Sequence, residues 1–477
     1  MRLRSPSPEY AVSVIVQLSC QGEIGARPRS PAPAGCRAAS RLHHAGAAPV
    51  RERPALVRPT RTPLLGYSSP MLERIVIVGA GQAAVQAVDT LRRRGFAGKL
   101  TLIGSEPWPP YQRPPLSKKY LAGALERERL LIRPAKFYAD HAVTTHFGRR
   151  VTDIAPRERH VRLDDGQIVP YDALMLATGS YPRRLPVPGA DLEGVHYLRT
   201  VDDADRIGAG LRSGGRLLIV GGGYIGLEVA ATARELGMEV TVLEMAERVM
   251  NRVTCPEVSA FYQAEHARHG VHIHCHEQVR ALHADARTGR VQSVLTEAGG
   301  EYPADVVLVG VGVAPADELA RAAGLECENG VVTEAHCRTS HEGIYAAGDC
   351  ASHLSRQYGR HLRLESVDNA FEQGTTVALN LTGNETLHDK LPWFWSDQFD
   401  LKLVIVGVAQ GYDTVVMRGS PAARSFSACY LRAGELIAID TINAPKDQMA
   451  ARKLIAAHVR PQPEKLADAG VALKDTV

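Results

Sequence analysis

The stretch that decides the fold is RIVIVGAGQAAVQAVDTLRRRGFAGKLTLIGSE, residues 74–106. Its pattern predicts a buried strand, a glycine turn, a helix and a second strand. Gly79, Gly81 and Ala84 fill the GxGxxG/A fingerprint. The first glycine permits a tight turn, the second lets a pyrophosphate approach the backbone, and the small third residue lets the helix pack on the strand. Because free N–H groups at a helix start attract anions, this turn predicts a dinucleotide site.

A second copy of the pattern is RLLIVGGGYIGLEVAATARELGMEVTVLE, residues 216–244. Gly221, Gly223 and Gly226 complete its fingerprint, and Ile225 is a further candidate for cofactor binding. A lone GxGxxG is a weak signal, but two copies in the same strand–turn–helix–strand context are a strong one. The sequence therefore predicts an α/β fold with two Rossmann-like dinucleotide-binding domains, of which the first binds FAD and the second binds NADH.

The acid at the end of each second strand bears on the ribose. Glu244 ends the second copy, where a carboxylate accepts a hydrogen bond from the ribose 2′-OH and repels a 2′-phosphate, which favours NADH over NADPH. A solvated surface acid is the alternative interpretation of Glu244. The first copy ends in IGSEP, so either Ser105 or Glu106 faces the ribose there. Glu106 is the better acceptor but stands one residue later, and both remain candidates.

Two later segments add to the first site. LMLATGSYP places Thr178 and Gly179 in a turn where the chain crosses to the second domain. IYAAGDC reads as a strand that ends in Asp349, whose carboxylate can hold ribitol hydroxyls of a flavin, although a surface turn acid is the alternative. A helix is predicted to begin near residues 366–368, where its N–H groups would stabilise negative charge on the reduced flavin.

Composition and charge exclude several classes of function. The 477 residues are 45% hydrophobic and 23% charged, as in an ordinary globular protein. Residues 1–70 hold ten Arg, three Glu, no Lys and no Asp, or +7, so the remainder carries 4 − 7 = −3. This mildly acidic remainder predicts no nucleic-acid binding. No run of eighteen apolar residues occurs, so no membrane span is expected.

The first 70 residues allow three interpretations. They are rich in Pro and Arg, lack helical or strand periodicity and cannot bury a core. They are translated upstream sequence with Met71 as the real start, a targeting peptide, or a disordered arm.

Cysteine and histidine usage suggests neither a disulfide framework nor a metal site. The eight cysteines are scattered without a CxxC pair, which suits a reducing cytoplasm. In VHIHCHEQV, the histidines alternate with Val271, Ile273 and Cys275, which predicts a strand with the histidines on its wet face. No metal site is therefore assigned.

Several motifs resemble the putidaredoxin-reductase-like ferredoxin reductases, FAD flavoproteins of the glutathione-reductase structural class. The resemblance runs from about residue 74 to the end and rests, in order, on RPPLSK, GGGYIGLEVAATA, YAAGDCA, RLESVDNAFEQ and PWFWSDQ. It implies a split FAD-binding domain at 71–185 and 307–385, an NAD-binding domain at 186–306, and a C-terminal α/β reductase domain at 386–477.

The resemblance also implies particular contacts. By family position, Trp395 would wall the flavin, with a core aromatic as the alternative, and Gly312 would shape the nicotinamide pocket. An acid is common in relatives at the position of Ser105, so the adenosine ribose contact there is in doubt. NAPKDQ at 443–448 departs from the commoner sequence, which would retune the partner surface. The expected FAD contacts are Ala83, Arg113, Lys118, Val151, Arg199, Asp349 and Val367.

The same resemblance implies a mechanism. NADH passes hydride to flavin N5, beside which Lys118 and Glu228 form an ion pair; a surface lysine is the alternative for Lys118. Residues 113–120 carry no cysteine, so no thiolate can receive electrons there. Electrons would leave the flavin one at a time to an acidic [2Fe–2S] ferredoxin that docks transiently and serves a cytochrome P450 or another oxygenase.

The partner surface and two rival functions remain open at this point. Candidate docking cations are Arg360, Arg363, Lys446, Arg452 and Lys453, with an ordinary mixed-charge face as the alternative. The rivals are an NADH reductase of rubredoxin or a quinone, and an NADH-sensing flavoprotein similar to apoptosis-inducing factor. A monomer and a dimer are equally compatible with the sequence.

Overall fold

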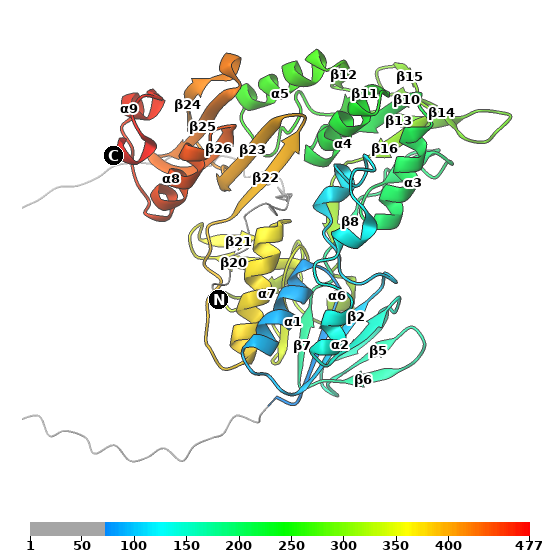
Figure 1. The fold of residues 1–477 in the computed structure, drawn as a ribbon, viewed down its shortest axis with the longest axis vertical. Helices are drawn as coiled ribbons and strands as arrows, with labels where there is room; N and C mark the ends of the chain where they lie inside the picture. The colour runs from blue at the N-terminus through cyan, green and yellow to red at the C-terminus, as the bar shows by residue number, and fades with distance from the viewer. Residues whose placement is uncertain (1–71) are drawn as a thin grey trace, which may run out of the picture. The chain divides into compact units, whose positions relative to one another are not determined.

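The computed structural model describes residues 72–477, so the expectations for residues 1–70 lie outside the described residues. The first glycine turn follows the central strand of a five-stranded parallel sheet (Figure 1). The strand order is β19–β7–β1–β2–β3, and every pairing is parallel. β19 joins this sheet although it follows the whole second sheet in the chain. The strands are β1 (Arg74–Val78), β2 (Lys99–Gly104), β3 (Val143–Phe147), β7 (Ala173–Leu176) and β19 (Ile344–Ala346).

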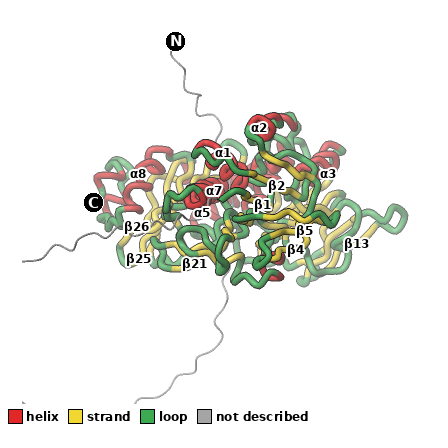
Figure 2. The backbone as a smooth tube through the Cα atoms, turned by 90° about the horizontal axis from the view of Figure 1, so that it is seen from below, coloured by secondary structure: helices red, strands yellow, loops and turns green. Residues whose placement is uncertain are grey.

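Alternate side chains of β1 enter two different cores. Ile75 and Ile77 pack with α1 (Gln82–Arg93) and α7 (Val367–Leu381), which lie side by side. Val76 and Val78 pack on the other face with a three-stranded antiparallel sheet. Figure 2 shows these helices and this small sheet on opposite sides of β1 and β2. A strand buried on both faces explains the continuous run of apolar residues. The small sheet comprises β4 (Val151–Ala155), β5 (His160–Leu163) and β6 (Ile168–Pro170).

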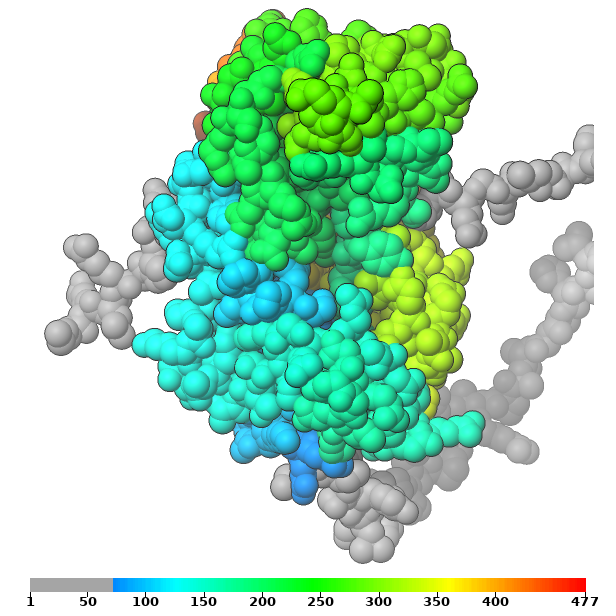
Figure 3. All heavy atoms as spheres, turned by 90° about the vertical axis from the view of Figure 1, so that its right-hand side faces the viewer, coloured from blue at the N-terminus to red at the C-terminus, as the bar shows by residue number. Residues whose placement is uncertain are grey.

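The second glycine turn follows the central strand of another five-stranded parallel sheet, β12–β11–β10–β16–β9. His272 and His274 of β12 are exposed and Val271 is buried, in the alternation that the sequence predicts. Figure 3 shows early segments, blue to cyan, in direct contact with segments of this second region, in green. Its elements are β9 (Val195–Tyr197), α3 (Val201–Arg212), β10 (Arg216–Val220), α4 (Tyr224–Glu235), β11 (Glu239–Glu244), α5 (Pro256–Arg268), β12 (Val271–Cys275) and β16 (Val306–Val309).

The C-terminal part of the described chain is built on a five-stranded antiparallel sheet, β22–β23–β26–β25–β24. Its core continues into the second region, because Tyr224 and Leu227 of α4 pack in the same cluster as Phe394 and Trp395. The elements are β22 (Trp393–Gln398), β23 (Leu401–Gly407), β24 (Thr414–Ser420), β25 (Ser425–Arg432), β26 (Glu435–Ile442), α8 (Pro445–Ala456) and α9 (Pro463–Ala467).

Shorter elements connect these sheets. They are α2 (Lys136–Asp140), β8 (Ser180–Pro182), β13 (Val279–Ala284), β14 (Val291–Thr296), β15 (Glu301–Pro303), β17 (Val313–Pro315), α6 (Glu318–Ala322), β18 (Val331–Thr333), β20 (Ala351–Ser355), β21 (Arg360–Leu362) and a 3₁₀ turn, Pro114–Ser117. Among residues 72–477, none of the helices has the length and apolar character needed to cross a membrane. The predicted fold class, two Rossmann-like units and a C-terminal unit of helices and strands, is confirmed.

Candidate functional site

A cavity of about 780 Å³ begins at the first glycine turn. Pockets that enclose a small ligand or cofactor measure about 300–1,000 Å³, so this one has a suitable size. Of the residues predicted from sequence, its wall includes Gly79, Gly81, Ala83, Ser105, Glu106, Arg113, Val151, Thr178, Gly179, Arg199, Ile225, Glu228, Asp349 and Val367. The predicted residues outside this wall are Ala84, Lys118, Gly221, Gly223, Gly226, Glu244, Gly312 and Trp395.

The first turn has the shape that a pyrophosphate requires. Gly79 has φ +108°, and a Cβ there would stand 2.0 Å from the carbonyl oxygen of Ala177. Only glycine is compatible with both the angle and the close contact. Gly81 caps α1 without any side-chain hydrogen bond, so the first N–H groups of the helix remain open toward the cavity. An open, positively polarised helix start fits a bound phosphate.

The acid expected beside the ribose is not equivalent in the two copies. Parallel pairing aligns Val78 with Ile103 and Val220 with Leu243, so Gly104 holds the place that Glu244 holds in the second copy. Ser105 is exposed and lines the cavity. Glu106 also lines it but is occupied by an ion pair of 2.5 Å with Arg113. The structure thus leaves Ser105 as the freer of the two candidates.

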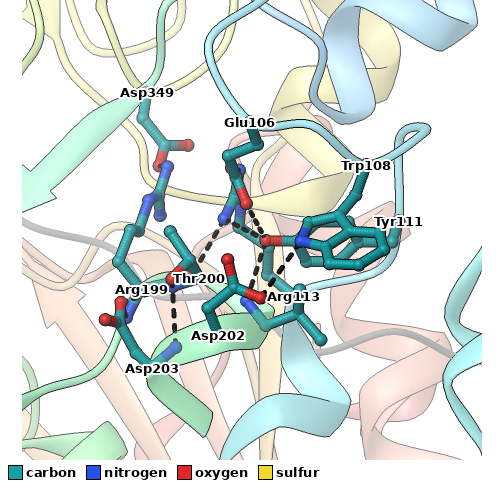
Figure 4. Close-up of polar contacts among 10 residues, drawn as sticks. Glu106, Trp108, Tyr111, Arg113, Arg199, Thr200, Asp202, Asp203 and Asp349 are labelled. Carbon is teal, nitrogen blue, oxygen red and sulfur yellow. Dashed lines mark hydrogen bonds and ion pairs between the residues drawn. The ribbon is translucent and has the colours of Figure 1, made fainter. Parts of the chain in front are cut away.

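A hydrogen-bonded network joins the loop after β2 to the start of α3 (Figure 4). The Tyr111 hydroxyl donates to Glu106 and accepts from the backbone N–H of Val201 at 2.9 Å. Arg113 donates to the Tyr111 hydroxyl at 3.1 Å and to the carbonyl oxygen of Arg199 at 2.8 Å. Burial raises the pKa of Tyr111, which keeps its phenol protonated. Arg113 therefore braces the cavity wall, and Tyr111 is a supporting residue that sequence reasoning missed.

Asp349 reaches the cavity with its carboxylate already oriented. The Ser180 hydroxyl donates to its Oδ2 at 2.8 Å, and the Arg199 guanidinium lies 3.3 Å from the same oxygen. Burial lowers the pKa of Arg199. Thr178 holds the adjoining turn, because its hydroxyl donates to the carbonyl of Ala316 at 2.6 Å. The residues predicted at the domain crossing and at Asp349 are thus brought together.

The predicted ion pair is present at the side of the cavity. Lys118 Nζ lies 2.6 Å from Glu228 Oε2, and the two side chains are 15% and 5% exposed. Glu228 lines the cavity, whereas Lys118 contacts Glu228 and does not itself line the cavity. The Lys118 ammonium is thus held next to the cavity wall rather than in bulk solvent, which disfavours the surface-lysine interpretation.

The start of α7 closes one end of the cavity. Ser366 caps the helix by accepting from the N–H of Asn369 at 2.9 Å, and Val367 follows as its first residue. The acid just before the cap, Glu365, also lines the cavity and was missed by sequence reasoning. Burial raises its pKa to about 8, although Arg363 lies 2.5 Å away. An acid directly before a helix cap in RLESVDNA was the signal available.

The second turn repeats the backbone of the first. Gly221 has φ +107°, and its N–H donates to the carbonyl of Leu243 at 2.8 Å. The Glu244 carboxylate accepts from the N–H groups of Gly222 at 2.6 Å and Ala246 at 2.8 Å. Glu244 therefore stands at the turn in a fixed orientation. Gly312, the glycine expected near the nicotinamide, lies between β16 and β17.

Trp395 and Arg363 both lie outside the cavity wall. Trp395 is 3% exposed and stacks on Trp393 with ring centroids 5.1 Å apart, inside the C-terminal core cluster. Its proposed place beside the flavin stays a prediction. Arg363 was wrongly counted among the docking cations, because it is 1% exposed and pairs with Glu365 and Asn329. The sequence alternation around β21 did not reveal that this cation is buried.

The cavity wall contains no cysteine among the described residues. The thiol nearest in sequence, Cys350, is fully buried and donates to the carbonyls of Ala347 and Leu176. Burial raises its pKa, which makes it a poor source of thiolate.

Two families match successive parts of the chain. Residues 73–374 match the family described as pyridine nucleotide-disulphide oxidoreductase. Residues 393–477 match the family described as reductase C-terminal. The first match covers both parallel sheets, and the second covers the antiparallel sheet.

Curated and solved relatives cover nearly the same part of the chain. Rhodocoxin reductase of Rhodococcus erythropolis is 43% identical over 400 residues, 84% of this chain and 93% of the relative. The crystal structure of the ferredoxin reductase for the CYP199A2 system of Rhodopseudomonas palustris has a TM-score of 0.82 and 41% identity, and the match covers 84% of this chain and 99% of that chain.

A further crystal structure, of the covalent complex of putidaredoxin reductase with putidaredoxin, has a TM-score of 0.81. Its identity is 42%, and the match covers 84% of this chain and 97% of that chain. The resemblance inferred from the motifs is therefore confirmed. The chain belongs to the pyridine nucleotide-disulphide oxidoreductase family, among the ferredoxin reductases similar to putidaredoxin reductase.

Proposed function

We propose that this chain is an NADH-dependent FAD flavoprotein that reduces a [2Fe–2S] ferredoxin, which in turn serves a cytochrome P450 or another oxygenase. The observation that carries the proposal is the cavity wall around Ser117 and Glu228, which holds no cysteine within residues 72–477. A disulphide reductase needs a thiolate at the flavin to take up electrons. Without one, the electrons leave the flavin directly, and the acceptor that we assign is the ferredoxin.

The cavity residues fit FAD. When bound, FAD takes two electrons from NADH and releases them one at a time. The open N–H groups at the start of α1 hold the pyrophosphate. Asp349, oriented by Ser180 and Arg199, would accept hydrogen bonds from ribitol hydroxyls. The capped start of α7 stabilises negative charge at the far end of the cavity.

Lys118 and Glu228 serve the charge balance of the site. The Lys118 ammonium stabilises the additional negative charge of the reduced cofactor, and Glu228 keeps the ammonium in place. Around the second turn, Gly221, Gly223, Ile225 and Gly226 hold the dinucleotide. Glu244 would accept a hydrogen bond from the ribose 2′-OH of NADH.

The ferredoxin partner is expected to be acidic and to dock transiently. Lys446 and Lys453 of α8 are exposed, and Arg452 stacks over the Trp393 ring at 4.3 Å. Arg360 of β21 is the remaining candidate. These cations would raise the association rate, and salt would weaken their effect. Trp395, stacked on Trp393, would form the wall between this surface and the flavin.

The division of the chain and its compartment are part of the same proposal. We place the FAD-binding parts at 71–185 and 307–385, the NAD-binding domain at 186–306 and the reductase domain at 386–477. The six cysteines in the described part of the chain are free thiols, which suits a reducing compartment such as the cytoplasm.

The test is an anaerobic titration of the purified full chain. NADH is added, then an oxidised [2Fe–2S] ferredoxin, while flavin and cluster absorbance are recorded. We expect the flavin to bleach quickly and two clusters to be reduced per NADH, faster at low salt. If the flavin bleaches but no ferredoxin accepts electrons, while rubredoxin or a quinone does, the ferredoxin assignment is wrong.

A further inference from the structure

A buried chain of hydrogen bonds leads from the cavity into the C-terminal sheet. The Ser396 hydroxyl on β22 donates to Glu228 Oε1 at 2.6 Å. The Gln398 side-chain amide donates to Ser396 Oγ at 3.2 Å. The Gln398 carbonyl oxygen lies 2.8 Å from His266 Nε2 on α5. All of these side chains are at most 5% exposed.

The direction of this chain follows from its end at Glu228. A carboxylate only accepts hydrogen bonds, so Ser396 must donate to it, and the Ser396 oxygen is then free to accept from Gln398. The Gln398 carbonyl in turn needs a donor, which requires a proton on His266 Nε2. Burial lowers the pKa of His266 to about 4, in agreement with a neutral ring.

Glu228 is thus surrounded by three donors that come from two separate segments of the fold. Ser117 donates to Oε2 at 2.5 Å from the loop after β2, and Lys118 contacts the same oxygen at 2.6 Å. Within residues 72–477, the donor to Oε1 is Ser396, from the C-terminal sheet. Without Ser396, one oxygen of a buried carboxylate would lack its donor, which is costly in a low-dielectric site.

The period of the strand explains why Ser396 reaches Glu228 in the cavity wall. Side chains at positions 394, 396 and 398 share one face of β22, and Phe394 packs edge-on against Tyr224 of α4 at 4.9 Å. Trp393 and Trp395 occupy the opposite face. One strand therefore holds the Glu228 carboxylate with one face and presents the tryptophan pair with the other.

We infer that Ser396 is a positioning residue for the reaction, which fixes Glu228 and thereby the Lys118 ammonium beside the cavity. The inference rests on the proposed function in that it takes the cavity to hold the flavin. Removal of the hydroxyl leaves the carboxylate charge less balanced. The local potential becomes more negative, which disfavours the reduced cofactor. The C-terminal sheet would thus set part of the reduction potential as well as carry the partner surface.

The experiment compares Ser396→Ala with Ser427→Ala in the full-length holoprotein. Ser427 lies in the same sheet, is 0% exposed and donates to a carboxylate, that of Asp447 at 2.9 Å. Unlike Glu228, Asp447 does not line the cavity. We expect Ser396→Ala to shift the flavin midpoint potential to more negative values. The rate of flavin reduction by NADH falls about tenfold and KM changes less than about twofold. Ser427→Ala leaves the potential unchanged.

Two additional variants guard the result. Ser396→Thr keeps the hydroxyl and should have the same flavin midpoint potential as the parent protein. Crystal structures should show a displaced Glu228 carboxylate in Ser396→Ala only. Should Ser396→Ala not fold, Ser396→Cys, with its weaker donor, should give a smaller shift in the same direction. Equal potentials in the parent, Ser396→Ala and Ser427→Ala would overturn the inference. These readings do not involve ferredoxin, so they remain valid if the acceptor assignment fails.

Discussion

Gly79 and Gly221 hold the same place in two copies of one strand–turn–helix unit. Their φ angles are +108° and +107°, and each N–H donates to the neighbouring strand at 2.8 Å, to Ile103 and Leu243. A Cβ would stand 2.0 Å from a backbone oxygen at Gly79 and 2.5 Å from one at Gly221. The backbone requirement of a dinucleotide turn is therefore met twice in the same way.

The two copies differ one residue further on. In the first, Ala80 of the turn faces Gly104, where a Cβ would stand 2.5 Å from the Ala80 Cβ. In the second, Gly222 faces Glu244 and donates its N–H to the carboxylate at 2.6 Å. The Ala–Gly pair of the first copy is thus replaced by a Gly–Glu pair in the second. The Ala80 side chain leaves no room for a side chain at the end of β2, whereas Gly222 leaves room for Glu244 at the end of β11.

The largest expected effect separates the two turns directly. Gly79→Ala forces a side chain into a positive φ and into the Ala177 carbonyl, so we expect protein that purifies without flavin and loses at least about 1–3 kcal/mol of stability. Gly221→Ala should retain flavin absorbance but raise the KM for NADH about tenfold or more. The flavin content per chain and steady-state kinetics measure both.

Matched controls are available one helix later in each copy. Gly95 and Gly237 follow α1 and α4, have φ +84° and +86°, and would bring a Cβ into open space. Gly95→Ala and Gly237→Ala should therefore cost about 1 kcal/mol through φ alone and leave both cofactors bound. Loss of flavin from Gly221→Ala as complete as from Gly79→Ala would show that the turns do not serve separate nucleotides.

A smaller effect is expected at the acid of the second copy. Glu244→Gln keeps the size of the side chain but removes its charge, so the 2′-OH of NADH loses a charged acceptor and a 2′-phosphate is no longer repelled. We expect the KM for NADH to rise about tenfold. The ratio of kcat/KM for NADH to kcat/KM for NADPH should fall by more than this factor. The control is Glu247→Gln, because Glu247 is close to Glu244 in the sequence and its side chain is 67% exposed. An unchanged preference would identify Glu244 as a structural cap of the turn.

These comparisons show what the sequence could and could not predict. The turns, the helix starts and Asp349 followed from local pattern or motif, because the chemistry of each resides in a few consecutive residues. The Lys118–Glu228 pair joins distant segments and was expected only from the family resemblance. The contacts of Glu106 with Tyr111 and Arg113 could not be predicted, because they depend on the directions of side chains in a loop without a periodic pattern. The contact of Arg363 with Asn329 and that of Ser396 with Glu228 join segments that are distant in the sequence.

The cavity at the first glycine turn also contains a buried acid, Glu365, whose titration can be measured. The pKa of Glu365 rises from the usual 4.5 to about 8 because burial disfavours its charge. Between these values the folded chain binds a proton that the unfolded chain has lost, so the free energy of unfolding falls as pH rises and levels off above about 8.

In Glu365→Gln, the fall in the free energy of unfolding between pH 5 and pH 8 should be smaller than in the parent by about 1–3 kcal/mol. Urea unfolding of the holoprotein at both pH values measures it. Asp440, whose pKa rises to about 7 through burial, contributes in the same direction, so the difference between variant and parent is the relevant quantity. The exposed Glu342, changed to Gln, should alter nothing. A slope unchanged in Glu365→Gln would mean that Arg363 keeps the acid ionised.

The smallest effect tests whether the first copy can be given the acid that it lacks. Gly104 is closed to any side chain by Ala80, so the nearest open position is Ser105, which is exposed and lines the cavity. A new carboxylate there would gain a hydrogen bond to the adenosine ribose, worth about 0.5–1.5 kcal/mol. Ser105→Asp should therefore tighten FAD about two- to tenfold in titrations of flavin-free protein. Glu106→Gln should weaken FAD less than that, because Glu106 is held by Tyr111 and Arg113. If Glu106→Gln has the larger effect, the ribose contact belongs to Glu106, and the first site obtains its acid from the loop rather than from the strand.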